Sequence, residues 1–497
     1  MKVPAGWTTA PLGDVSDVLD YARVPINAEA REKRPGPIPY FGATGQVGWI
    51  DDWIFDEELI LLGEDGAPFL DANKPKAYRV TGKSWVNNHA HVLRGCRGIS
   101  NRFLLHQLNA TDYAPFVSGT TRLKLPQGQM RLIPLRIAPQ REQERVVVAL
   151  EEHLSRIEAG VLALERVKKE LARYRASVLK AACEGRLVPT EAALARAEGR
   201  CYEAASDVLA RILAERLARW DGKIGYADPT APDSGSLPPL PEGWVWASLD
   251  QVLLSLRNGV SAVPRETSGV AILRISAVRA LRVDLTDRRF LAGPAASYEG
   301  YVLEAGDVLF TRYNGSRDLV GVCACLPTPN GPLIYPDKII RVRVQRELVA
   351  QFIAMAANVN ASRAHIEKRI RTTAGQSGIS GGDLRSMPVP LPPVAEQQRI
   401  VAEVERRLSI ADEIAATVDS ALARAARLRQ SILKRAFEGK LVPQDPSDEP
   451  ASVLLARIRA EREAANAQSK PSKRTRRPSG SAETPPGVGR RRKETPP

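Results

Sequence analysis

Polar and aromatic side chains gather in several short segments rich in Gly, Asn and Thr near the start of this chain. In the DNA major groove, Arg and Lys can bond guanine, whereas Asn and Gln can bond adenine. The same segments also favour tight turns, so each residue has a structural interpretation beside the binding one. The candidate DNA-binding residues of this region are Tyr40, Thr44, Gln46, Lys74, Lys76, Asn87, Asn88, His89, Thr120, Thr121, Arg122 and Lys124.

A second group with the same chemistry lies in the later half of the chain, mainly within residues 312–317 and 371–377. Loops held on a rigid scaffold commonly carry binding residues. The candidates in this half are Arg274, Arg279, Arg312, Tyr313, Asn314, Ser316, Arg317, Lys338, Arg371, Gln376 and Ser377.

The sequence contains no recognisable motif for catalysis. A DNA methyltransferase needs a glycine-rich cofactor loop and an Asn/Asp-Pro-Pro-aromatic motif, and neither is found. A GxxxxGK[ST] phosphate loop is also missing, which argues against an ATP motor. Pro336 and Asp337 are followed only by Glu367 and Lys368 in a helical pattern, which is a poor match to a metal nuclease. We expect no catalytic and no cofactor-binding residue in this chain.

Histidine and cysteine usage gives little support for a metal site. His89 and His91 are close in sequence, but no cysteine cluster lies near them. Cys323 and Cys325 would share one face of a strand, yet no second cysteine pair completes a zinc site. We therefore predict no metal ligands. The 5 scattered cysteines fit buried thiols in a reducing cytosol.

The elements that must position these loops occur twice. Residues 142–189 recur as residues 396–443 at one constant offset and without a gap. The two copies are most similar in the segments SVLKAACEGRLVP, which ends at Pro189, and SILKRAFEGKLVP, which ends at Pro443. The repeat is far longer than a solenoid unit of roughly 20–50 residues. It indicates that half of the molecule has been duplicated.

Each copy is predicted to form one long helix. Apolar residues recur at alternating intervals of three and four from position 147 to 178 and from 401 to 432, which is typical of a coiled-coil seam. Pro139 and Pro393 precede the helix starts, and Gly185 and Gly439 are expected to end the helices. A helix of about 40 residues would extend over about 60 Å.

Each long helix follows a globular region that opens with a similar phrase, PAGW ending at Trp7 and PEGW ending at Trp244. We call these regions the first and second heads. Short apolar runs between Gly, Pro and Asn predict strands at 59–62, 77–80 and 91–93, and at 271–275, 307–311, 320–324 and 339–344. The predicted layout is a first head at 1–133, a long-helix region at 134–220, a linker at 221–240, a second head at 241–387, a second long-helix region at 388–465 and a disordered basic tail at 466–497.

The composition is compatible with a nucleic-acid partner. The 497 residues carry a net charge of +14, and 43% are hydrophobic, which is enough to bury substantial cores. The tail from residue 466 holds nine Lys and Arg against two Glu, so half of the excess charge lies in a segment that cannot build a core. No apolar run of about 18 residues predicts a membrane span, and no signal-peptide pattern opens the chain.

Taken together, these features identify a family resemblance. The chain resembles the specificity subunits of type I restriction–modification systems over nearly its whole length. The resemblance is carried by the head–helix–head–helix plan, by PLPPVAEQQRIV at 390–401, and by the doubled phrase that recurs at 431–443. The segment GATGQVGWIDD at 42–52 also looks like a first recognition domain of this family.

The resemblance implies an α+β protein in which two globular α/β-type target-recognition domains are separated by two long helices. The helices would form an antiparallel coiled coil with approximate two-fold symmetry, and each head would read one half of a split DNA site. Two modification (methyltransferase) subunits would dock on this chain, and two restriction (motor-nuclease) subunits could join them in the cytoplasm. S-adenosylmethionine, ATP and Mg²⁺ would be bound by those partners and not by this chain. The basic tail is not part of the family pattern.

Two other classes of function are compatible with parts of the sequence. One is a coiled-coil adaptor whose heads bind proteins and do not touch DNA. This adaptor would show no salt-sensitive DNA binding. The other is a self-contained enzyme acting on DNA, which the missing motifs disfavour and which a cofactor-binding assay would reveal.

Overall fold

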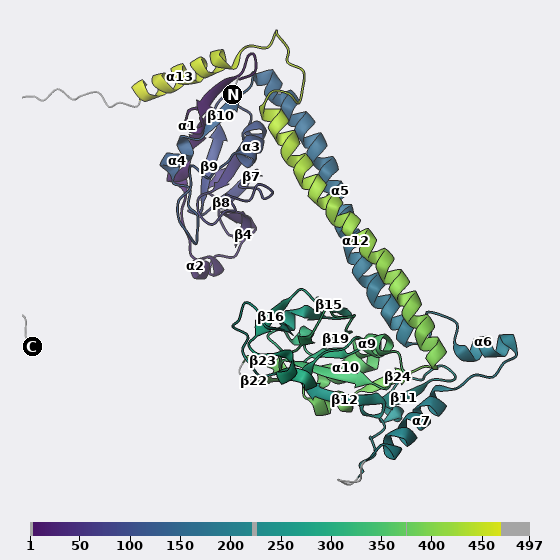
Figure 1. The fold of residues 1–497 in the computed structure, drawn as a ribbon. Coiled ribbons are helices and arrows are strands. Elements are labelled where there is room, and N and C mark those ends of the chain that lie inside the picture. The colour runs from purple at the N-terminus through teal and green to yellow at the C-terminus, as the bar shows by residue number, and fades with distance from the viewer. Residues whose placement is uncertain (1–2, 221–225, 374, 469–497) are drawn as a thin grey trace, which may run out of the picture. The chain divides into compact units, whose positions relative to one another are not determined.

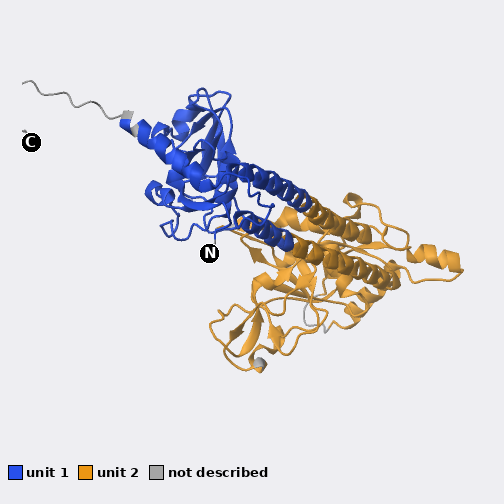
Figure 2. Cartoon of the chain, turned by 90° about the horizontal axis from the view of Figure 1, so that it is seen from above, with its two compact units in different colours: residues 1–161, 423–497 blue, residues 162–422 orange. Residues whose placement is uncertain are grey.

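The computed structural model describes residues 3–220, 226–373 and 375–468 (Figure 1). The chain divides into two compact units (Figure 2). Unit 1 comprises residues 1–161 and 423–497, and unit 2 comprises residues 162–422. These units cut across the two long helices, so each contains one head and part of both helices. The domain layout given above divides the chain at the helix ends and remains a prediction. Most of the predicted tail lies outside the described residues.

The two long helices are α5 (Gln140–Cys183) and α12 (Val394–Phe437), each with 44 residues. They start directly after Pro139 and Pro393, as predicted. Both end at a glycine with φ +65°, Gly185 and Gly439, where the left-handed backbone favours glycine. Arg186 N donates back to Ala181 O at 2.9 Å, and the equivalent bond closes α12. These are Schellman-type helix ends, and they confirm the predicted stops.

Inside each unit the two helices run antiparallel. In unit 1, Val147, Leu150 and Leu154 of α5 share a buried cluster with Leu433 and Phe437 of α12. Farther along α5 in the same unit, Glu158 pairs with Arg429 at 3.3 Å.

In unit 2, Lys168 pairs with Asp419 at 2.8 Å and Arg175 with Asp412 at 2.5 Å. Later residues of α5 therefore meet earlier residues of α12, which confirms the antiparallel packing. Lys168 occupies a predicted seam position but is exposed, and its ammonium group pairs with the Asp419 carboxylate, which is also exposed.

The first head contains two sheets of four strands and one strand pair. Leu59–Gly63 lies inside the first sheet and is fully buried, so hydrophobic burial fixes its register. The first sheet has the strand order β2 (Ser16–Val18), β9 (Ala90–Gly95), β6 (Leu59–Gly63), β7 (Ala77–Val80). The second sheet has the strand order β4 (Gly45–Ile50), β3 (Ile38–Gly42), β8 (Lys83–Val86), β5 (Phe55–Asp56). The strand pair consists of β1 (Thr8–Pro11) and β10 (Pro134–Ile137). The helices of unit 1 besides α5 and α12 are α1 (Leu12–Val15), α2 (Ala28–Glu32), α3 (Asn101–Ala110), α4 (Gln127–Arg131) and α13 (Ala451–Gln468).

The second head is built from smaller sheets around the buried strand β17. The largest sheet has the order β12 (Leu253–Asn258), β21 (Ile339–Val344), β17 (Val308–Thr311), β19 (Cys323–Cys325). Two sheets of three strands have the orders β16 (Arg288–Leu291), β13 (Val270–Leu273), β20 (Leu333–Ile334) and β18 (Tyr313–Asn314), β23 (Gln376–Gly378), β22 (Arg371–Thr373). Two strand pairs are formed by β14 (Val278–Arg279) with β15 (Arg282–Val283) and by β11 (Val245–Ser248) with β24 (Pro388–Leu391). The remaining helices of unit 2 are α6 (Glu191–Glu198), α7 (Ala205–Ala218), α8 (Leu249–Val252), α9 (Ala350–Ala357), α10 (Asn360–Arg369) and α11 (Gly381–Arg385).

The predicted strands are found with small shifts in their ends. The largest shift concerns residues 320–324, where the strand starts only at Cys323. Val320 instead follows the 3-10 turn Arg317–Leu319, and the carbonyl of Arg317 accepts its N–H. Among the described residues, no helix is long and apolar enough to cross a membrane.

The same bonds join each head to its long helix. The buried amide of Gln143 accepts from Ser100 N and donates to Ala138 O, both at 3.0 Å. Its repeat counterpart Gln397 accepts from Val349 N at 3.0 Å and donates to Pro392 O at 2.9 Å. Ser100 and Val349 are the N-cap residues of α3 and α9. The duplicated sequence therefore forms a duplicated joint.

A further joint repeats between the short helices and the openings of the heads. Ala205 N, at the start of α7, donates to Gly243 O at 2.9 Å. Ala451 N, at the start of α13, donates to Gly6 O at 2.8 Å. Each helix thus packs on the tight turn before a buried tryptophan, which explains why the PAGW and PEGW phrases recur.

Candidate DNA interface

Six predicted residues of the second head meet around two adjacent hollows in its surface. Tyr313 and Gln376 line both hollows. The small sheet β18-β23-β22 pairs residues 313–314 with the strand that carries Gln376, and Arg312 N donates to Lys338 O at 2.7 Å, which brings Lys338 to the same place. The six residues are Arg312, Tyr313, Asn314, Lys338, Arg371 and Gln376.

The chemistry of the first hollow combines cationic donors with a carboxylate. The guanidinium carbon of Arg312 lies 4.6 Å from the ring centroid of Tyr313, so the two side chains form a cation–π contact. Asp383 lines the same hollow. Burial raises the pKa of Asp383, but hydrogen bonds from Ser380 and the charge of Arg371 outweigh burial and lower it. The hollow therefore offers donors and an ionised acceptor, which are the groups that read base edges.

The other predicted residues of the second head are placed differently. Arg317 donates from Nη2 to the backbone oxygen of Glu367 at 2.8 Å, so it closes the end of α10. Ser377 is buried, and its Oγ lies 2.9 Å from Thr372 Oγ1. Three residues are exposed and do not line the two hollows: Arg274, Arg279 and Ser316.

In the first head, predicted residues from two loops meet at acidic side chains that follow β6. Arg122 Nη2 lies 2.6 Å from Asp65 Oδ1, and His89 Nδ1 lies 2.9 Å from the same oxygen. Lys124 Nζ lies 3.4 Å from Glu64 Oε1. The exposed predicted residues on these loops are Asn88, Thr120, Thr121, Arg122 and Lys124. The loops at 87–89 and 118–124 therefore form one polar surface.

The β3–β4 hairpin presents Thr44 and Gln46, which are both exposed. Gly45 between them has φ +141°, where glycine is favoured, and a Cβ added there would meet no atom within 4 Å. Asn87 is only 9% exposed, and its Oδ1 accepts from His89 N at 2.8 Å. Asn87 therefore positions the 87–89 loop and offers little of its side chain to a ligand.

The predictions for Tyr40 and Lys76 as direct DNA contacts are wrong. Tyr40 is 1% exposed, and its hydroxyl donates to Ile26 O at 3.0 Å. Lys76 is 2% exposed, and its Nζ donates to Asp71 O at 2.5 Å. Burial lowers the pKa of Lys76, partly opposed by the charge of Asp71. The sequence analysis treated both as loop residues, although Tyr40 belongs to β3 and Lys76 directly precedes β7.

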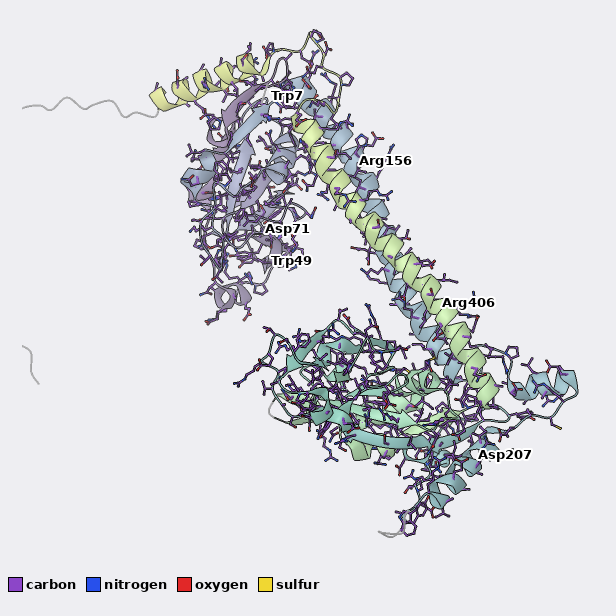
Figure 3. All side chains as sticks on the ribbon, in the orientation of Figure 1. Trp7, Trp49, Asp71, Arg156, Asp207 and Arg406 are labelled. Atoms are coloured by element: carbon purple, nitrogen blue, oxygen red, sulfur yellow. The ribbon has the colours of Figure 1, made fainter. Side chains whose placement is uncertain are left out.

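Lys74 lies in a loop that packs on α12, although its own side chain is 67% exposed. It lies 3.7 Å from Asp71 of the same loop (Asp71 is labelled in Figure 3). In unit 1 this loop packs on α12, where Gln430 Nε2 donates to Ala72 O at 2.5 Å. The loop at 71–76 is therefore occupied by contacts within its own unit.

The sequence analysis did not include the exposed aromatic residues of the first head among the candidate DNA contacts. Trp49 of β4, labelled in Figure 3, lies on the same face as Val47. Trp49 is 57% exposed and Val47 is 50% exposed. Trp53 is 44% exposed, with Lys83 Nζ only 3.5 Å from its ring centroid. The alternation of faces along the strand at residues 45–50 buries Ile50 and exposes Trp49, and this pattern could have predicted the exposed tryptophan from the sequence. An exposed tryptophan at a polar surface is a strong candidate for a contact residue.

Comparison with known proteins decides the family. Residues 4–166 match the family described as type I restriction modification DNA specificity domain. The type I restriction enzyme EcoKI specificity subunit of Escherichia coli (strain K12) is 30% identical over 495 residues, covering 93% of this chain and 97% of that protein. This chain belongs to the type I restriction enzyme specificity subunits.

Further relatives agree with this assignment. The StySPI specificity subunit of Salmonella potsdam is 24% identical over 492 residues, covering 93% of this specificity subunit and 96% of the relative. A chain solved in a study of complex assembly and conformational transition of the type I R-M system gives a TM-score of 0.52 at 18% identity. That likeness covers 88% of this chain and 100% of the other, and it supports the fold. The specificity subunit is thus a non-catalytic recognition component with an α+β fold and long helices.

Proposed function

We propose that this specificity subunit reads a bipartite DNA sequence with one head for each half-site. The observation that carries the proposal is that the two heads are attached to their helices by equivalent bonds but present different polar surfaces. Gln143 and Gln397 attach the heads to their helices by equivalent bonds. The polar surfaces that the heads present share no such equivalence: one surrounds Asp65, and the other surrounds Tyr313 and Gln376. Two heads that are attached in the same way but present different surfaces are suited to reading two different base sequences.

The contact residues that we propose follow from exposure and charge. In the second head, Arg312, Arg371 and Gln376 would meet base edges, and Lys338 would meet a phosphate. In the first head, the proposed contacts come from residues of the two loops and the hairpin that are exposed or, for His89, half-buried. These are Thr44, Gln46, Asn88, His89, Thr120, Thr121, Arg122 and Lys124.

We further propose the assembly in which this subunit acts. Two modification subunits would dock on it and supply S-adenosylmethionine-dependent methylation, and two restriction subunits with ATP and Mg²⁺ would complete a cytoplasmic restriction complex. The long helices run through both units, so their length would set the spacing between the half-sites. This chain itself would bind no cofactor.

The test is a titration of the full chain, co-purified with its modification subunits, against duplexes at several salt concentrations. The genomic methylation pattern of the host supplies the sequence of both half-sites. We expect tight, salt-dependent binding to the intact site and weaker binding when either half is scrambled. Binding that ignores both half-sites would contradict the proposal, and no salt-sensitive binding at all would favour the adaptor alternative.

A further inference from the structure

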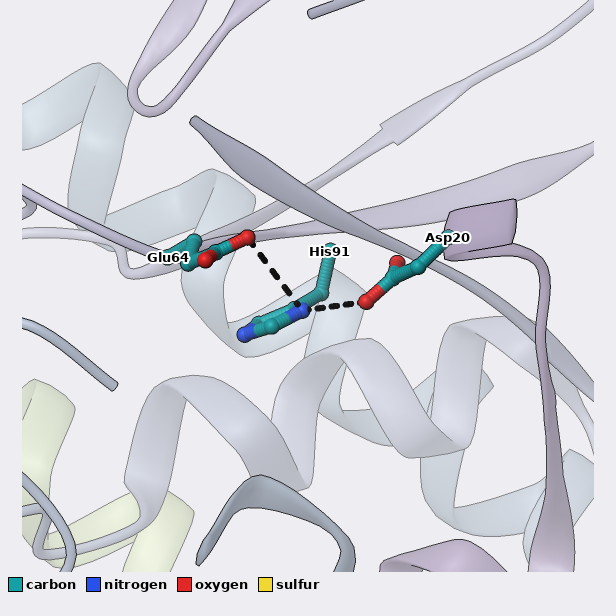
Figure 4. Close-up of side chains that lie close together, drawn as sticks. All are labelled: Asp20, Glu64 and His91. Atoms are coloured by element: carbon teal, nitrogen blue, oxygen red, sulfur yellow. Dashed lines mark hydrogen bonds and ion pairs between the residues drawn. The ribbon is translucent and has the colours of Figure 1, made fainter. Parts of the chain in front are cut away.

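A fully buried histidine in the first head lies between two acidic side chains (Figure 4). His91 belongs to β9 and is 0% exposed. Its Nδ1 lies 2.6 Å from Asp20 Oδ2 and 3.8 Å from Glu64 Oε2. Its Nε2 lies 2.8 Å from Leu125 O. Both ring nitrogens therefore face oxygen atoms.

The hydrogen-bond geometry indicates which form of the ring occupies this place. A neutral imidazole has one N–H and one bare nitrogen, whereas the imidazolium has two N–H donors. Leu125 O can only accept. Burial would raise the pKa of Asp20, but hydrogen bonds from His91, Gln127 and Val92 lower it, so Asp20 is an ionised acceptor. Only the imidazolium satisfies both oxygens, because a bare nitrogen facing an oxygen at this distance would be repelled.

The charges around the ring are balanced by side chains of the protein. Arg23 places Nη1 2.8 Å from Glu64 Oε2 and Nη2 3.4 Å from Asp20 Oδ2. Lys124 Nζ lies 3.4 Å from Glu64 Oε1, and Gln127 Nε2 donates to Asp20 Oδ2 at 2.8 Å. These side chains, with His91 and the backbone N–H of Val92, are the charged and polar groups that the described residues place against the two carboxylates.

The same cluster has the composition of a cation site, since the candidate ligand atoms of Asp20, Glu64 and His91 lie within 4.8 Å of one another. The surrounding contacts favour a proton over a metal. The guanidinium of Arg23 already bonds to one carboxylate and lies near the other, and Nδ1 points at an oxygen at hydrogen-bond distance. A divalent ion would have to displace these bonds.

The carbonyl that His91 holds belongs to the loop at 118–125. Leu125 N donates to Glu64 O at 2.7 Å, and Gly66 N donates to Leu123 O at 3.0 Å. Ser118 and Lys124 exchange backbone bonds at 3.0 and 2.8 Å, which closes the loop. Thr120, Thr121 and Arg122, the exposed candidate contacts, project from the closed part. His91 therefore anchors this loop from inside the head.

We propose that protonated His91 is a positioning residue for the first half-site: it fixes the loop at 118–125 through Leu125 O while Asp20 holds the ring. It never touches DNA, and its effect is confined to the head that carries it. The proposal rests on the proposed function, since it needs the loop to read DNA.

The test compares the His91→Gln variant with a His153→Gln control in the full chain co-purified with its modification subunits. His153 lies exposed on α5, far in sequence from either head surface. Three duplexes are titrated: the intact site, one with the first half scrambled, and one with the second half scrambled. We expect His91→Gln to lose about tenfold in discrimination at the first half-site and nothing at the second, because a hydrogen bond to a charged donor is removed. His153→Gln should match the parent protein at both.

Two measurements keep the outcome interpretable if His91→Gln unfolds the head. Hydrogen exchange should speed up at the amides of Leu125 and Gly66 while the β6 amides remain protected. If protection is lost throughout the head, the milder Asp20→Asn variant replaces it, with the same expectation at reduced size. ¹⁵N-histidine spectra should show two protonated ring nitrogens on the resonance that His91→Gln removes.

The results separate the two levels of the proposal. Unchanged first-half discrimination in both variants, or a neutral ring, overturns the role of His91 while the proposed function stands. A parent protein that ignores both half-sites overturns the proposed function itself. Binding of Zn²⁺ at one equivalent that both His91→Gln and Asp20→Asn abolish would show that the cluster is a metal site, and this would also overturn the positioning role.

Discussion

The indole Nε1 of Trp244 donates a hydrogen bond to Oε1 of Glu396 at 3.0 Å, inside the buried joint between the second head and α12. Trp7 and Glu142 occupy the equivalent positions in the first copy of the repeat. Burial raises the pKa of Glu396, and the N–H of Glu191 and the indole oppose that rise. The same opposition between burial and the Trp7 indole acts on the pKa of Glu142. The joint thus buries a carboxylate in both halves.

Replacing Trp244 with Phe should weaken the second joint. The change leaves one oxygen of Glu396 buried without its donor, which costs about 1–3 kcal/mol in the free energy of unfolding. Trp246→Phe is a matched control, because that indole donates to Pro238 O near the surface and water can replace it. Urea unfolding of both variants measures the difference. Equal losses in the two variants would show that the joint does not depend on this bond.

His106 should make the first joint sensitive to acid. Burial lowers the pKa of His106 from 6.5 to about 4, helped by the charges of Arg102 and Arg429. The unfolded chain therefore binds this proton at a higher pH than the folded chain. The stability is fully present above pH 6.5 and falls as the pH drops toward 4. The loss is at most about 3 kcal/mol, because Glu151 Oε1 lies 3.4 Å from Nε2 of this 14% exposed side chain and favours the protonated ring.

The His106→Gln variant supplies the comparison for that pH effect. Its free energy of unfolding should vary less between pH 6.5 and 4 than that of the parent protein. Urea titrations at a series of pH values in this window measure both slopes. Identical slopes would mean that His106 is protonated in the folded head.

In the second head, Arg312→Ala should relax the sequence requirement at one position of the second half-site. A lost base contact costs about 1–3 kcal/mol against the preferred base and leaves the first half-site unchanged. Lys338→Ala should weaken binding to all sequences alike and reduce the salt slope by about 1. Arg274→Ala, outside the two hollows, is the matched control. A selection from randomised duplexes reads out all three, and a change in the first half-site would refute the assignment.

The length of the helix pair should set the spacing between half-sites. Four residues added after Leu164 and four after Leu422 lie at facing positions, because Glu158 meets Arg429 and Lys168 meets Asp419. Each insertion adds about 6 Å, comparable to one or two base pairs, and turns the seam only slightly. Methylation mapping should show a longer spacer between unchanged half-sites. The same residues inserted at Gly199, in the turn after α6, lie outside α5 and should leave the spacer unchanged.

The sequence predicted the repeated parts of the fold best. Heptad spacing, Pro139 and Gly185 act locally, so the ends of α5 could be placed within a few residues. The strand of residues 59–63 was equally clear, because a buried run between turn residues has few alternatives. Burial of single polar side chains was harder. Lys76 looks like a loop cation until α12, more than 300 residues later, is seen to pack on its loop.

The surfaces of the heads show the same limit. The six residues around the hollows of the second head come from three separate segments. The pairing of β18, β23 and β22 joins two of these segments, and the bond from Arg312 N to Lys338 O joins the third. His91 was considered as a metal ligand because of its neighbour His89. Its true partners, Asp20 and Leu125, are distant in sequence, so neither spacing nor composition could reveal them.

The central claim, that each head reads one half-site, is tested most directly by exchanging one head. Residues 12–133 are replaced by those of a related specificity subunit, which keeps the β1–β10 pair, Trp7 and the bond from Gln143 to Ala138 O. The genome-wide methylation pattern of cells carrying the exchanged chain is then determined. We predict that one half of the methylated site changes while the other half and the spacer are retained. A change in both halves, or in neither, would contradict the account.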